Sequence, residues 1–515
     1  MGTQHHRVYY FLQLRRGEGE PQLKASCKLP SQMYFFDNSP KKPKRLLLRL
    51  IFLLILASCS LFFFPRLLFC SSSHLCPLFY SFGDEEKLQV LQVGTRVPCS
   101  SPIPNNTICC DRSAFRTDVC FMRGDVRTQS YSKSILLYPG NNASIPAPAT
   151  EERIRPYTRK WETSVMATID ELRLTAAAGG GGSGCDVRHA VPAVVFSAGG
   201  YTGNVYHEFN DGIIPLFITS QKFNRRVVFV VLDYHNWWFT KYGDVLSRLS
   251  DHPPLDFFGD SRAHCFLEAI VGLRIHDELT VDAERMENNK TIFDFRQLLD
   301  DAYRPRIRSL EYDEQQTSPW PSMNIAKRHN LRSSYQPKLM IMSRNGSRAI
   351  ENELKLVKLG EEIGFIVEIL RPDRTTELAK IYRALNSSDA MIGVHGAAMT
   401  HLLFMRPGSV FIQIVPLGTD WAAKTYYGDP AVRMGLWYVG YKILKRESSL
   451  YREYDKSDPV LRDPRSMAKK GWHVTKRVYL DRQNVNLDLK RFRKHLIRAH
   501  KYLVSKKRIK HGKEK

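Results

Sequence analysis

Acidic residues are scarce in this sequence, and the short acidic motif that often holds a metal ion against a diphosphate is missing. The 515 residues include 52 Asp or Glu against 76 Lys or Arg, which gives a formal net charge of +24, and no Asp-x-Asp triplet occurs. Because divalent cations in such sites are bound by carboxylate oxygens, this absence argues against an obligatory metal cofactor. It favours neutralisation of anions by arginine side chains and helix N-termini.

Cysteine is absent beyond residue 265. The two adjacent cysteines, Cys109 and Cys110, do not fit a zinc-binding pattern. Disulfide bonds are therefore expected, formed in an oxidising compartment and confined to the first part of the folded chain. The odd number of cysteines in this region leaves at least one thiol unpaired; the seven are Cys76, Cys99, Cys109, Cys110, Cys120, Cys185 and Cys265.

The excess positive charge lies at the two ends of the chain. Residues 1–45 carry nine Lys or Arg against three acids, and residues 474–515 carry fifteen against three. A charge distribution of this kind is typical of solvated or membrane-facing tails, so no nucleic-acid partner is expected. Hydrophobic residues make up 43% of the chain and charged residues 25%, which at this length predicts two folded units with real cores.

One apolar run is long enough to cross a membrane. Residues 46–64 contain a single charged residue and directly follow the basic segment 41–45. The positive-inside rule then predicts a cytoplasmic tail (1–45), a transmembrane signal anchor (46–70) and a lumenal stem (71–104), in single-pass type II topology. A cleaved signal peptide is the alternative, although the polar leader is long for one. Five Asn-x-Ser/Thr sequons fall on the predicted lumenal side: Asn105, Asn142, Asn289, Asn345 and Asn386.

The first folded lobe is predicted to span residues 105–325. Strand-like apolar runs at 191–196 and 226–232 enclose a helical segment at 204–221, which is the spacing of a β-α-β unit. The glycine-rich stretch 176–184 has no Lys-Ser/Thr pair, so it is interpreted as a flexible loop and a phosphate-binding P-loop is excluded.

The second lobe is predicted to span residues 326–485 and to follow a polar linker at 311–336. Its continuous apolar strands favour a parallel sheet covered on both faces, so we expect an α/β protein with two Rossmann-like lobes facing each other across a cleft. Residues 486–515 are predicted to form a basic helix or tail with apolar residues that can pack back onto a lobe. The expected strands are 338–342, 365–370, 390–394 and 409–415, and the expected helices are 349–364 and 375–385.

Two segments at the ends of predicted strands carry candidate ligand-binding residues, because open α/β sheets bind ligands at the carboxyl ends of their strands. Arg344 and Arg348 flank a turn after the first strand of the second lobe and can hold a diphosphate. His395, Gly396 and Ala397 follow a later strand, where small residues allow close approach to a donor phosphate. From the next strand, Gln413 can reach a base or ribose. The alternative interpretations are two surface arginines without a ligand and, for the Gly-Ala-Ala segment at 396–398, simple tight packing of a helix on the sheet.

A second group of candidates lies in the first lobe. On a helix, Asn204, His207 and Asp211 share one face at spacings of three and four residues. His207, oriented by Asp211, is the first choice for a general base, and Asp211 or Glu208 itself is the alternative. A helix N-cap beside a structurally satisfied histidine remains the non-catalytic interpretation.

Several longer blocks, taken in order, resemble plant members of glycosyltransferase family 61. The resemblance covers roughly residues 105–500, with modest departures at Met399 and in the glycine run 179–182. The blocks are GDVRT, VPAVVFSAGGYTGNVYHEFNDG, RIHDEL, MSRNGSRAIENE, GVHGAAMTHLLFMRPGSVFIQIVP and the WHV segment at Trp472.

The resemblance implies a GT-B fold, an inverting mechanism and a UDP-sugar donor, with a pentose, xylose or arabinofuranose, transferred to xylan or a related glycan. Together with the predicted anchor and the missing acidic motif, it leads us to expect a Golgi membrane enzyme without an obligatory cofactor, able to form a homo- or hetero-oligomer there. A β-1,2-xylosyltransferase of N-glycans and a non-catalytic Golgi scaffold are the alternatives. The family's site pattern falls on Asn204, His207, Asp211, Arg344, Arg348, His395 and Gly396.

Overall fold

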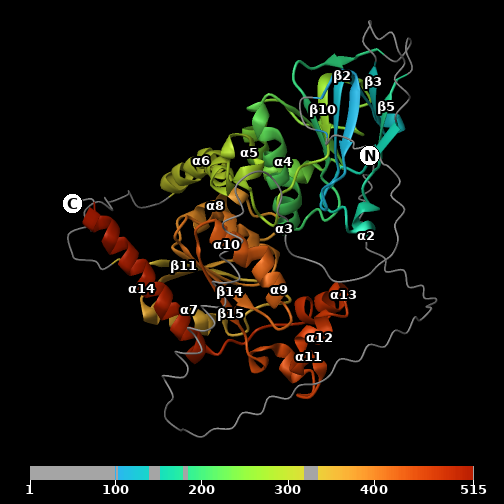
Figure 1. Ribbon diagram of the computed structural model, residues 1–515. Coiled ribbons are helices and arrows are strands. Elements are labelled where there is room, and N and C mark those ends of the chain that lie inside the picture. Colours follow the sequence, from blue (N-terminus) through green and yellow to red (C-terminus); the bar gives the residue numbers. More distant parts are fainter. Residues whose placement is uncertain (1–98, 100–102, 139–150, 178–183, 318–334, 514–515) are drawn as a thin grey trace, which may run out of the picture. The chain divides into compact units, whose positions relative to one another are not determined.

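The protein is described by a computed structural model that covers residues 99, 103–138, 151–177, 184–317 and 335–513. The expected anchor at 46–70 and most of the expected stem lie outside the described residues. Among the helices in the described ranges, none is both long and apolar enough to span a membrane. The described chain contains two β-sheets with helices packed around them, which confirms the predicted α/β class (Figure 1).

The second sheet is entirely parallel and has the strand order β12-β11-β13-β14-β15. Chain order therefore reverses between β11 and β13, and this reversal creates a topological switch point at the carboxyl ends of those two strands. All residues of β13 and β14 are buried, as expected for a parallel sheet covered on both faces. The strands are β11 (Lys338–Met342), β12 (Ile366–Leu370), β13 (Ala390–Val394), β14 (Val410–Val415) and β15 (Trp437–Lys442).

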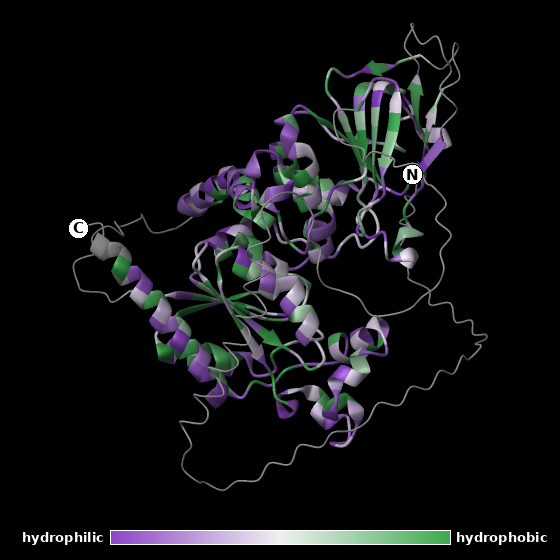
Figure 2. Ribbon diagram, viewed as in Figure 1, coloured by the Kyte–Doolittle hydropathy of each residue, from purple (hydrophilic) through white to green (hydrophobic). Residues whose placement is uncertain are grey.

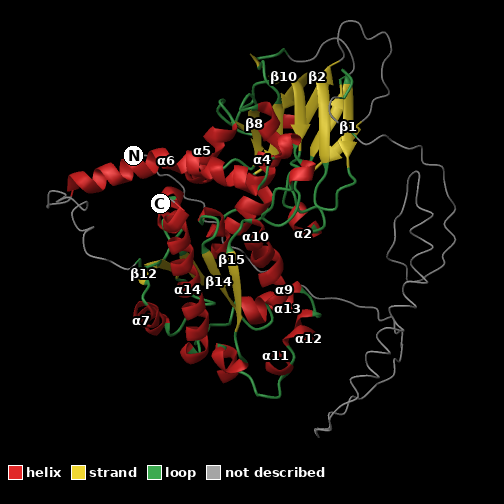
Figure 3. Cartoon of the chain, turned by 60° about the vertical axis from the view of Figure 1, so that its left-hand side comes forward, coloured by secondary structure: helices red, strands yellow, loops and turns green. Residues whose placement is uncertain are grey.

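Helices cover both faces of this sheet (Figure 3). On one face lie α7 (Glu353–Ile363), which ends at Gly364 in a left-handed conformation, and α14 (Leu489–Lys513). On the other lie α8 (Leu378–Asn386) and the 3-10 helix η7 (Ala397–Phe404). Because Phe492, Leu496 and Leu503 of α14 are buried in the core, the basic C-terminal helix is part of this lobe, as its apolar residues predicted.

The first sheet differs from the expected Rossmann-like lobe at 105–325, because it is mixed. Strands β10, β7, β8 and β9 are parallel, whereas β2 runs antiparallel to β1, β3 and β10. The polar residues Arg123, Asp125 and Arg127 alternate along β2, a pattern typical of antiparallel strands with one solvated face. The strands are β1 (Thr107–Asp111), β2 (Val119–Gln129), β3 (Ser134–Tyr138), β4 (Glu151–Ile154), β5 (Leu172–Ala176), β6 (Val187–Arg188), β7 (Ala193–Ser197), β8 (Val228–Leu232), β9 (Leu255–Asp256) and β10 (His264–Val271).

Three disulfide bonds tie this first part of the chain together, as expected. They join Cys99 to Cys109, Cys110 to Cys120 and Cys185 to Cys265. The second of them links directly paired residues of β1 and β2. Cys76 lies outside the described residues.

One continuous helical segment beside the first sheet is made of α3 (Val205–His207), the π-helical turn η2 (Glu208–Ile213) and α4 (Ile214–Ser220).

The predicted linker at 311–336 begins too early, because α6 continues to Thr317. The other helices are α2 (Thr163–Met166), α5 (Asn236–Leu249), α6 (Ile292–Thr317), α9 (Asp420–Ala423), α10 (Asp429–Arg433), α11 (Pro459–Arg462), α12 (Pro464–Ala468) and α13 (Trp472–Thr475).

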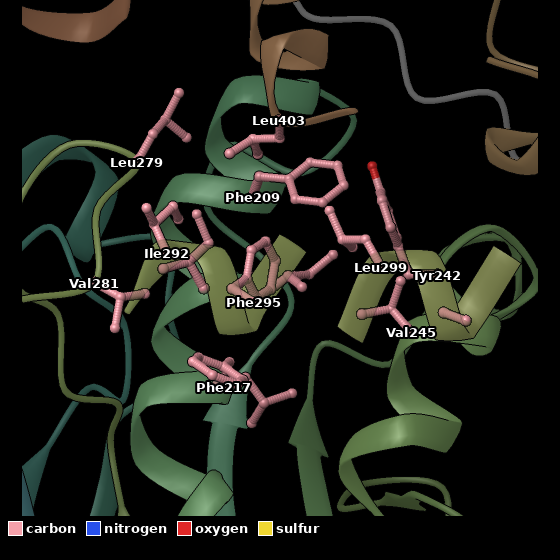
Figure 4. Packing of buried hydrophobic residues seen from close by; sticks show 14 of the residues in the cluster. Phe209, Phe217, Tyr242, Val245, Leu279, Val281, Ile292, Phe295, Leu299 and Leu403 are labelled. Carbon is pink, nitrogen blue, oxygen red and sulfur yellow. The ribbon is translucent and has the colours of Figure 1, made fainter. Parts of the chain in front are cut away.

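One hydrophobic core contains side chains from the helices of both sheets. Figure 4 shows Phe209 of η2 among Leu403, Phe295 and Tyr242, and Phe209 also meets Phe404 of η7 edge to face at 5.9 Å. The strands of both sheets are rich in hydrophobic residues, whereas α6 and α14 carry many hydrophilic ones (Figure 2). This shared core holds α3 against η7, and both elements carry candidate site residues.

Replacing Phe209 with alanine should lower the free energy of unfolding by about 3–5 kcal/mol, because the ring is fully buried and its loss leaves a cavity. Urea denaturation monitored by circular dichroism measures this. As a control, Tyr312→Ala changes a side chain that is 62% exposed and should alter the free energy of unfolding by less than about 0.5 kcal/mol. Equal effects of the two variants would contradict the packing described.

Candidate active site

The loops that follow β11 and β13 meet at the switch point of the second sheet. Arg344 and Arg348 come from the first loop, and His395 and Gly396 from the second. Gly396 has a φ of 152°, and a Cβ atom there would lie 2.6 Å from Nη1 of Arg348 and 2.7 Å from Nη1 of Arg344. Only glycine therefore allows both guanidinium groups to lie over this backbone. The structure brings together the four residues predicted for this region.

Neither guanidinium group forms an ion pair with a carboxylate among the residues that the structure describes. Arg344 donates to the backbone oxygen of Ser347 at 3.3 Å and Arg348 to that of His395 at 3.2 Å, and within the described ranges neither arginine forms an ion pair. Nε of Arg348 is buried and has no hydrogen-bond partner in the part of the chain that the structure describes. Burial lowers the pKa of both side chains, and the nearby charge of Arg344 helps to lower that of Arg348 to about 10. Two adjacent, partly desolvated cations of this kind form an anion site.

The conformation of Arg348 supports this arrangement. Its φ is +60°, in the left-handed region that non-glycine residues rarely occupy. Its backbone N–H donates to the backbone oxygen of Gln483 at 2.6 Å, which fixes the end of the loop against a distant segment. Backbone strain of this kind often occurs at ligand-binding sites.

His395 is held as a neutral ring beside the two arginines. Burial, followed by the charges of Arg348 and Arg344, lowers the pKa of its imidazole to about 3. The hydroxyl of Tyr438 donates to Oε1 of Gln413 at 2.8 Å, and Nε2 of Gln413 lies 3.0 Å from Nδ1 of His395. In this arrangement the amide donates to Nδ1, so Nε2 of the imidazole carries the hydrogen.

The predicted reach of Gln413 to a base or ribose stays a prediction. Gln413 is fully buried on an interior strand of a sheet covered on both faces, and its amide contacts His395 and Tyr438. Through the first of these contacts it positions the His395 ring. Ala397, by contrast, is partly exposed at the first position of η7, directly after Gly396.

The second group of candidates centres on the Asp211 carboxylate. Oδ2 of Asp211 accepts hydrogen bonds from Nδ1 of His207 at 2.6 Å and from Nε of Arg159 at 2.7 Å, and Oδ1 accepts one from Asn210 at 2.7 Å. Burial alone would raise the pKa of Asp211, but the hydrogen bond from His207 and the charge of Arg159 outweigh it and hold the pKa below its usual value. Asp211 is thus an ionised, fully occupied carboxylate that orients His207.

His207 remains available for chemistry. Because Nδ1 donates to Asp211, Nε2 is left as an acceptor. The imidazole stacks on the Tyr201 ring at 4.1 Å, and both side chains line a pocket. This is the geometry of a general base oriented by a carboxylate.

Two other predicted residues have structural partners. Oδ1 of Asn204 caps α3 by accepting the backbone N–H of Tyr206 at 3.1 Å. Glu208 is buried, accepts hydrogen bonds from Gly203 and Trp238, and has its pKa raised by burial. Asn204 therefore starts the helix that carries His207, and Glu208, which lines the same pocket as His207, stays the predicted alternative base.

Three aromatic contacts connect the two groups. His207 meets Tyr206 at 5.2 Å, Tyr206 meets Tyr427 at 5.7 Å, and Tyr427 meets His395 at 5.4 Å. Arg159, Tyr427 and Tyr438 were not predicted from the sequence. Each acts on a residue far away along the chain, so no local spacing pattern could reveal it.

The site thus combines two adjacent arginines, which form no ion pair within the described residues, with His207. Three aromatic contacts separate His207 from His395 beside the arginines. Within the described residues there is no cluster of three or more His, Cys, Asp or Glu side chains arranged to hold a metal ion. Paired cations at the switch point of a doubly wound sheet, linked by aromatic rings to a carboxylate-oriented histidine, are an arrangement that group-transfer enzymes use for phosphorylated donors.

Comparison with known proteins agrees with this class. Residues 206–412 match the family described as Glycosyltransferase 61. This range includes His207, Asp211, Arg344, Arg348, His395 and Gly396, and it leaves out Arg159, Asn204 and Gln413. A xylan glycosyltransferase of Arabidopsis thaliana is 54% identical over 467 residues, which cover 90% of this chain and 93% of that protein. Two rice proteins (Oryza sativa subsp. japonica) are more distant. An alpha-1,3-arabinosyltransferase is 36% identical over 76% of this chain and 64% of its own length, and a beta-1,2-xylosyltransferase is 35% identical over 77% and 84%.

The chain belongs to glycosyltransferase family 61, as the sequence blocks predicted, and it is a glycosyltransferase.

The ring of His395 should stay neutral at every pH at which the protein is folded. Its folded pKa of about 3 lies below the ordinary 6.5, so between these values the unfolded chain binds a proton that the folded chain does not. The free energy of unfolding therefore falls as the pH drops through this window. NMR of ¹³C-labelled histidine, with the signal assigned by His395→Gln, should show no titration of this ring between about pH 8 and about pH 5. A titration midpoint near the ordinary histidine value would contradict the described environment.

Proposed function

We propose that this glycosyltransferase transfers a pentose, xylose or arabinofuranose, from a UDP-sugar to xylan, with inversion at the anomeric carbon and in a GT-B arrangement of its two sheet-containing parts. The observation that carries the proposal is the pair of partly buried guanidinium groups at the switch point, neither of which forms an ion pair within the described residues. The names of the relatives favour xylan over an N-glycan as acceptor, because the relative at 54% identity is a xylan glycosyltransferase.

The donor diphosphate would occupy the space beside Arg344 and Arg348. Its negative charge satisfies two cations that otherwise remain unpaired, and the unpartnered Nε of Arg348 offers a further donor. As the bond between C1 of the sugar and the phosphate oxygen breaks, its electron pair leaves with UDP, and the guanidinium groups stabilise that charge. In this proposal the two arginines take the role that a divalent metal has in other enzymes, so no metal is required.

The acceptor hydroxyl would be activated by His207. Nε2 takes the hydroxyl proton while the oxygen attacks C1 from the side opposite the leaving diphosphate, which inverts the anomeric configuration. Asp211 stabilises the imidazolium that forms, and Arg159 and Asn210 keep Asp211 ionised and in place. His395, neutral and with its hydrogen on Nε2, donates a hydrogen bond towards the donor side without adding a third positive charge.

We place the enzyme in the Golgi membrane, with type II topology and a lumenal catalytic part. Three disulfide bonds support an oxidising compartment, and the apolar run at 46–64 after basic residues supports a signal anchor.

Replacing either donor-side arginine by methionine, which keeps the apolar stem, should weaken UDP binding about 10- to 100-fold, because a charge-assisted hydrogen bond is lost. Isothermal titration calorimetry on the lumenal part, from residue 94 on, measures this, and added EDTA should leave wild-type affinity unchanged.

The stability of these variants provides the control. Arg344→Met and Arg348→Met should keep or raise the melting temperature, because each removes an unpaired, partly buried charge. Arg452→Met, which removes an exposed arginine paired with Glu351, should bind UDP like the wild type. Wild-type UDP affinity in Arg344→Met and Arg348→Met would refute the donor site.

His207→Ala should lower kcat about 10²- to 10⁴-fold and leave UDP affinity unchanged, because the proton acceptor is removed without touching the donor site. Transfer from UDP-xylose or UDP-arabinofuranose to xylo-oligosaccharides, followed by mass spectrometry, measures kcat. His252, which precedes β9 at the opposite end of the parallel strands, offers a control, and His252→Ala should retain full activity. Full turnover by His207→Ala would exclude it as the base.

A further inference from the structure

A row of stacked side chains leads from His207 to the surface of the first part of the chain. Tyr201 stacks on His207 at 4.1 Å, and the guanidinium of Arg159 lies 5.6 Å from the Tyr201 ring. The same guanidinium also lies 5.1 Å from the ring of Trp161. Phe115 stacks on Trp161 at 5.2 Å, with an angle of 15° between the rings. Phe115 ends the row and is 73% exposed.

The loop that carries Phe115 is firmly held. It connects β1 and β2, which the Cys110–Cys120 disulfide joins at its base. The backbone N–H and the ammonium group of Lys160 donate to the backbone oxygens of Arg116 and Arg112 at 3.1 and 2.8 Å. A large apolar ring presented to water on a braced loop has no role in the core, and it has the properties of a preorganised binding surface.

A second exposed aromatic residue is linked to His207 through a different set of rings. Tyr206, in contact with His207, meets Tyr426 at 5.3 Å, and Tyr426 meets Trp421 at 5.4 Å. Trp421 of α9 is 64% exposed. Two exposed rings are therefore connected to His207, Phe115 through Trp161, Arg159 and Tyr201, and Trp421 through Tyr426 and Tyr206.

The charges along the row restrict what it can bind. Arg159 is paired with Asp211 and Glu162, and Arg116 with Glu278, so the row offers aromatic faces and hydrogen-bonding groups with its charges already paired. Such a surface suits a neutral carbohydrate chain, whose C–H faces stack on aromatic rings while its hydroxyls meet polar edges. Pentopyranose rings lack the exocyclic CH₂OH group, so they present flat faces on both sides.

We infer that Phe115, supported by Trp161, and Trp421 are acceptor-binding residues that hold sugar units beyond the reacting one. This inference rests on the proposed function and adds to it that the enzyme recognises an extended neutral pentose chain over several units. Neither residue belongs to the donor site or to the proton-transfer pair.

The test is direct binding of xylohexaose and xylobiose to the lumenal part, measured by calorimetry without any donor. Phe115→Ala and Trp421→Ala should each weaken xylohexaose binding about tenfold, which corresponds to about 1.4 kcal/mol, and Phe115→Tyr should restore it. UDP affinity and melting temperature should not change in these variants. Tyr312→Ala, which removes another exposed aromatic side chain, is the matched control and should bind like the wild type.

The outcomes separate this inference from the proposed function. Wild-type xylohexaose affinity in both Phe115→Ala and Trp421→Ala overturns the inference even if the wild type transfers pentose to xylan. Weakened binding with wild-type UDP affinity supports it. A wild-type protein that binds xylohexaose through these rings but transfers no pentose would refute the proposed donor chemistry and leave the acceptor surface standing.

Discussion

Two positive charges lie side by side at the carboxyl end of the second sheet, and the surrounding structure is arranged to keep them there without a carboxylate partner. Burying a cation costs free energy unless an opposite charge compensates it, and Arg344 also repels Arg348. The fold accepts this cost: Gly396 leaves room for both side chains, and Arg348 adopts a left-handed backbone conformation. An arrangement that is unfavourable without an anion is best explained by an anion that completes it.

The Asp211 side of the site has the opposite electrostatic character. Asp211 is saturated with hydrogen bonds and an ion pair, so its negative charge stays with His207 and Arg159. The charges of Arg344 and Arg348 and the charge of Asp211 belong to separate networks, so neither set cancels the other. Neutral aromatic rings, Tyr206 and Tyr427, occupy the space between them.

Local patterns in the sequence were sufficient for four of the five strands of the second sheet, β11 to β14. Its strands are short, continuous apolar runs, and β11 and β13 have the predicted bounds, so the residues after them were correctly placed at one edge. The i, i+4 spacing of His207 and Asp211 likewise predicted their hydrogen bond. In the first sheet, the antiparallel strand β2 is half polar and pairs with β10, so residues more than a hundred positions apart lie side by side. A local sequence pattern cannot predict a pairing over that distance.

The role of Gln413 illustrates the remaining limit. Its place on a strand was predicted from the sequence. Whether its side chain points towards a bound nucleotide or into the interior of the lobe was not. That is decided by Tyr438 on the neighbouring strand β15, which the sequence did not reveal as a strand. Arg159 is a similar case, because its partner Asp211 lies on another element.

The central claim, that the two arginines hold a diphosphate, is tested most directly by a crystal structure of the lumenal part with UDP. The account predicts pyrophosphate oxygens within hydrogen-bonding distance of both guanidinium groups, with Nε of Arg348 gaining a partner. A diphosphate bound elsewhere, with Arg344 and Arg348 still unpaired, would contradict it.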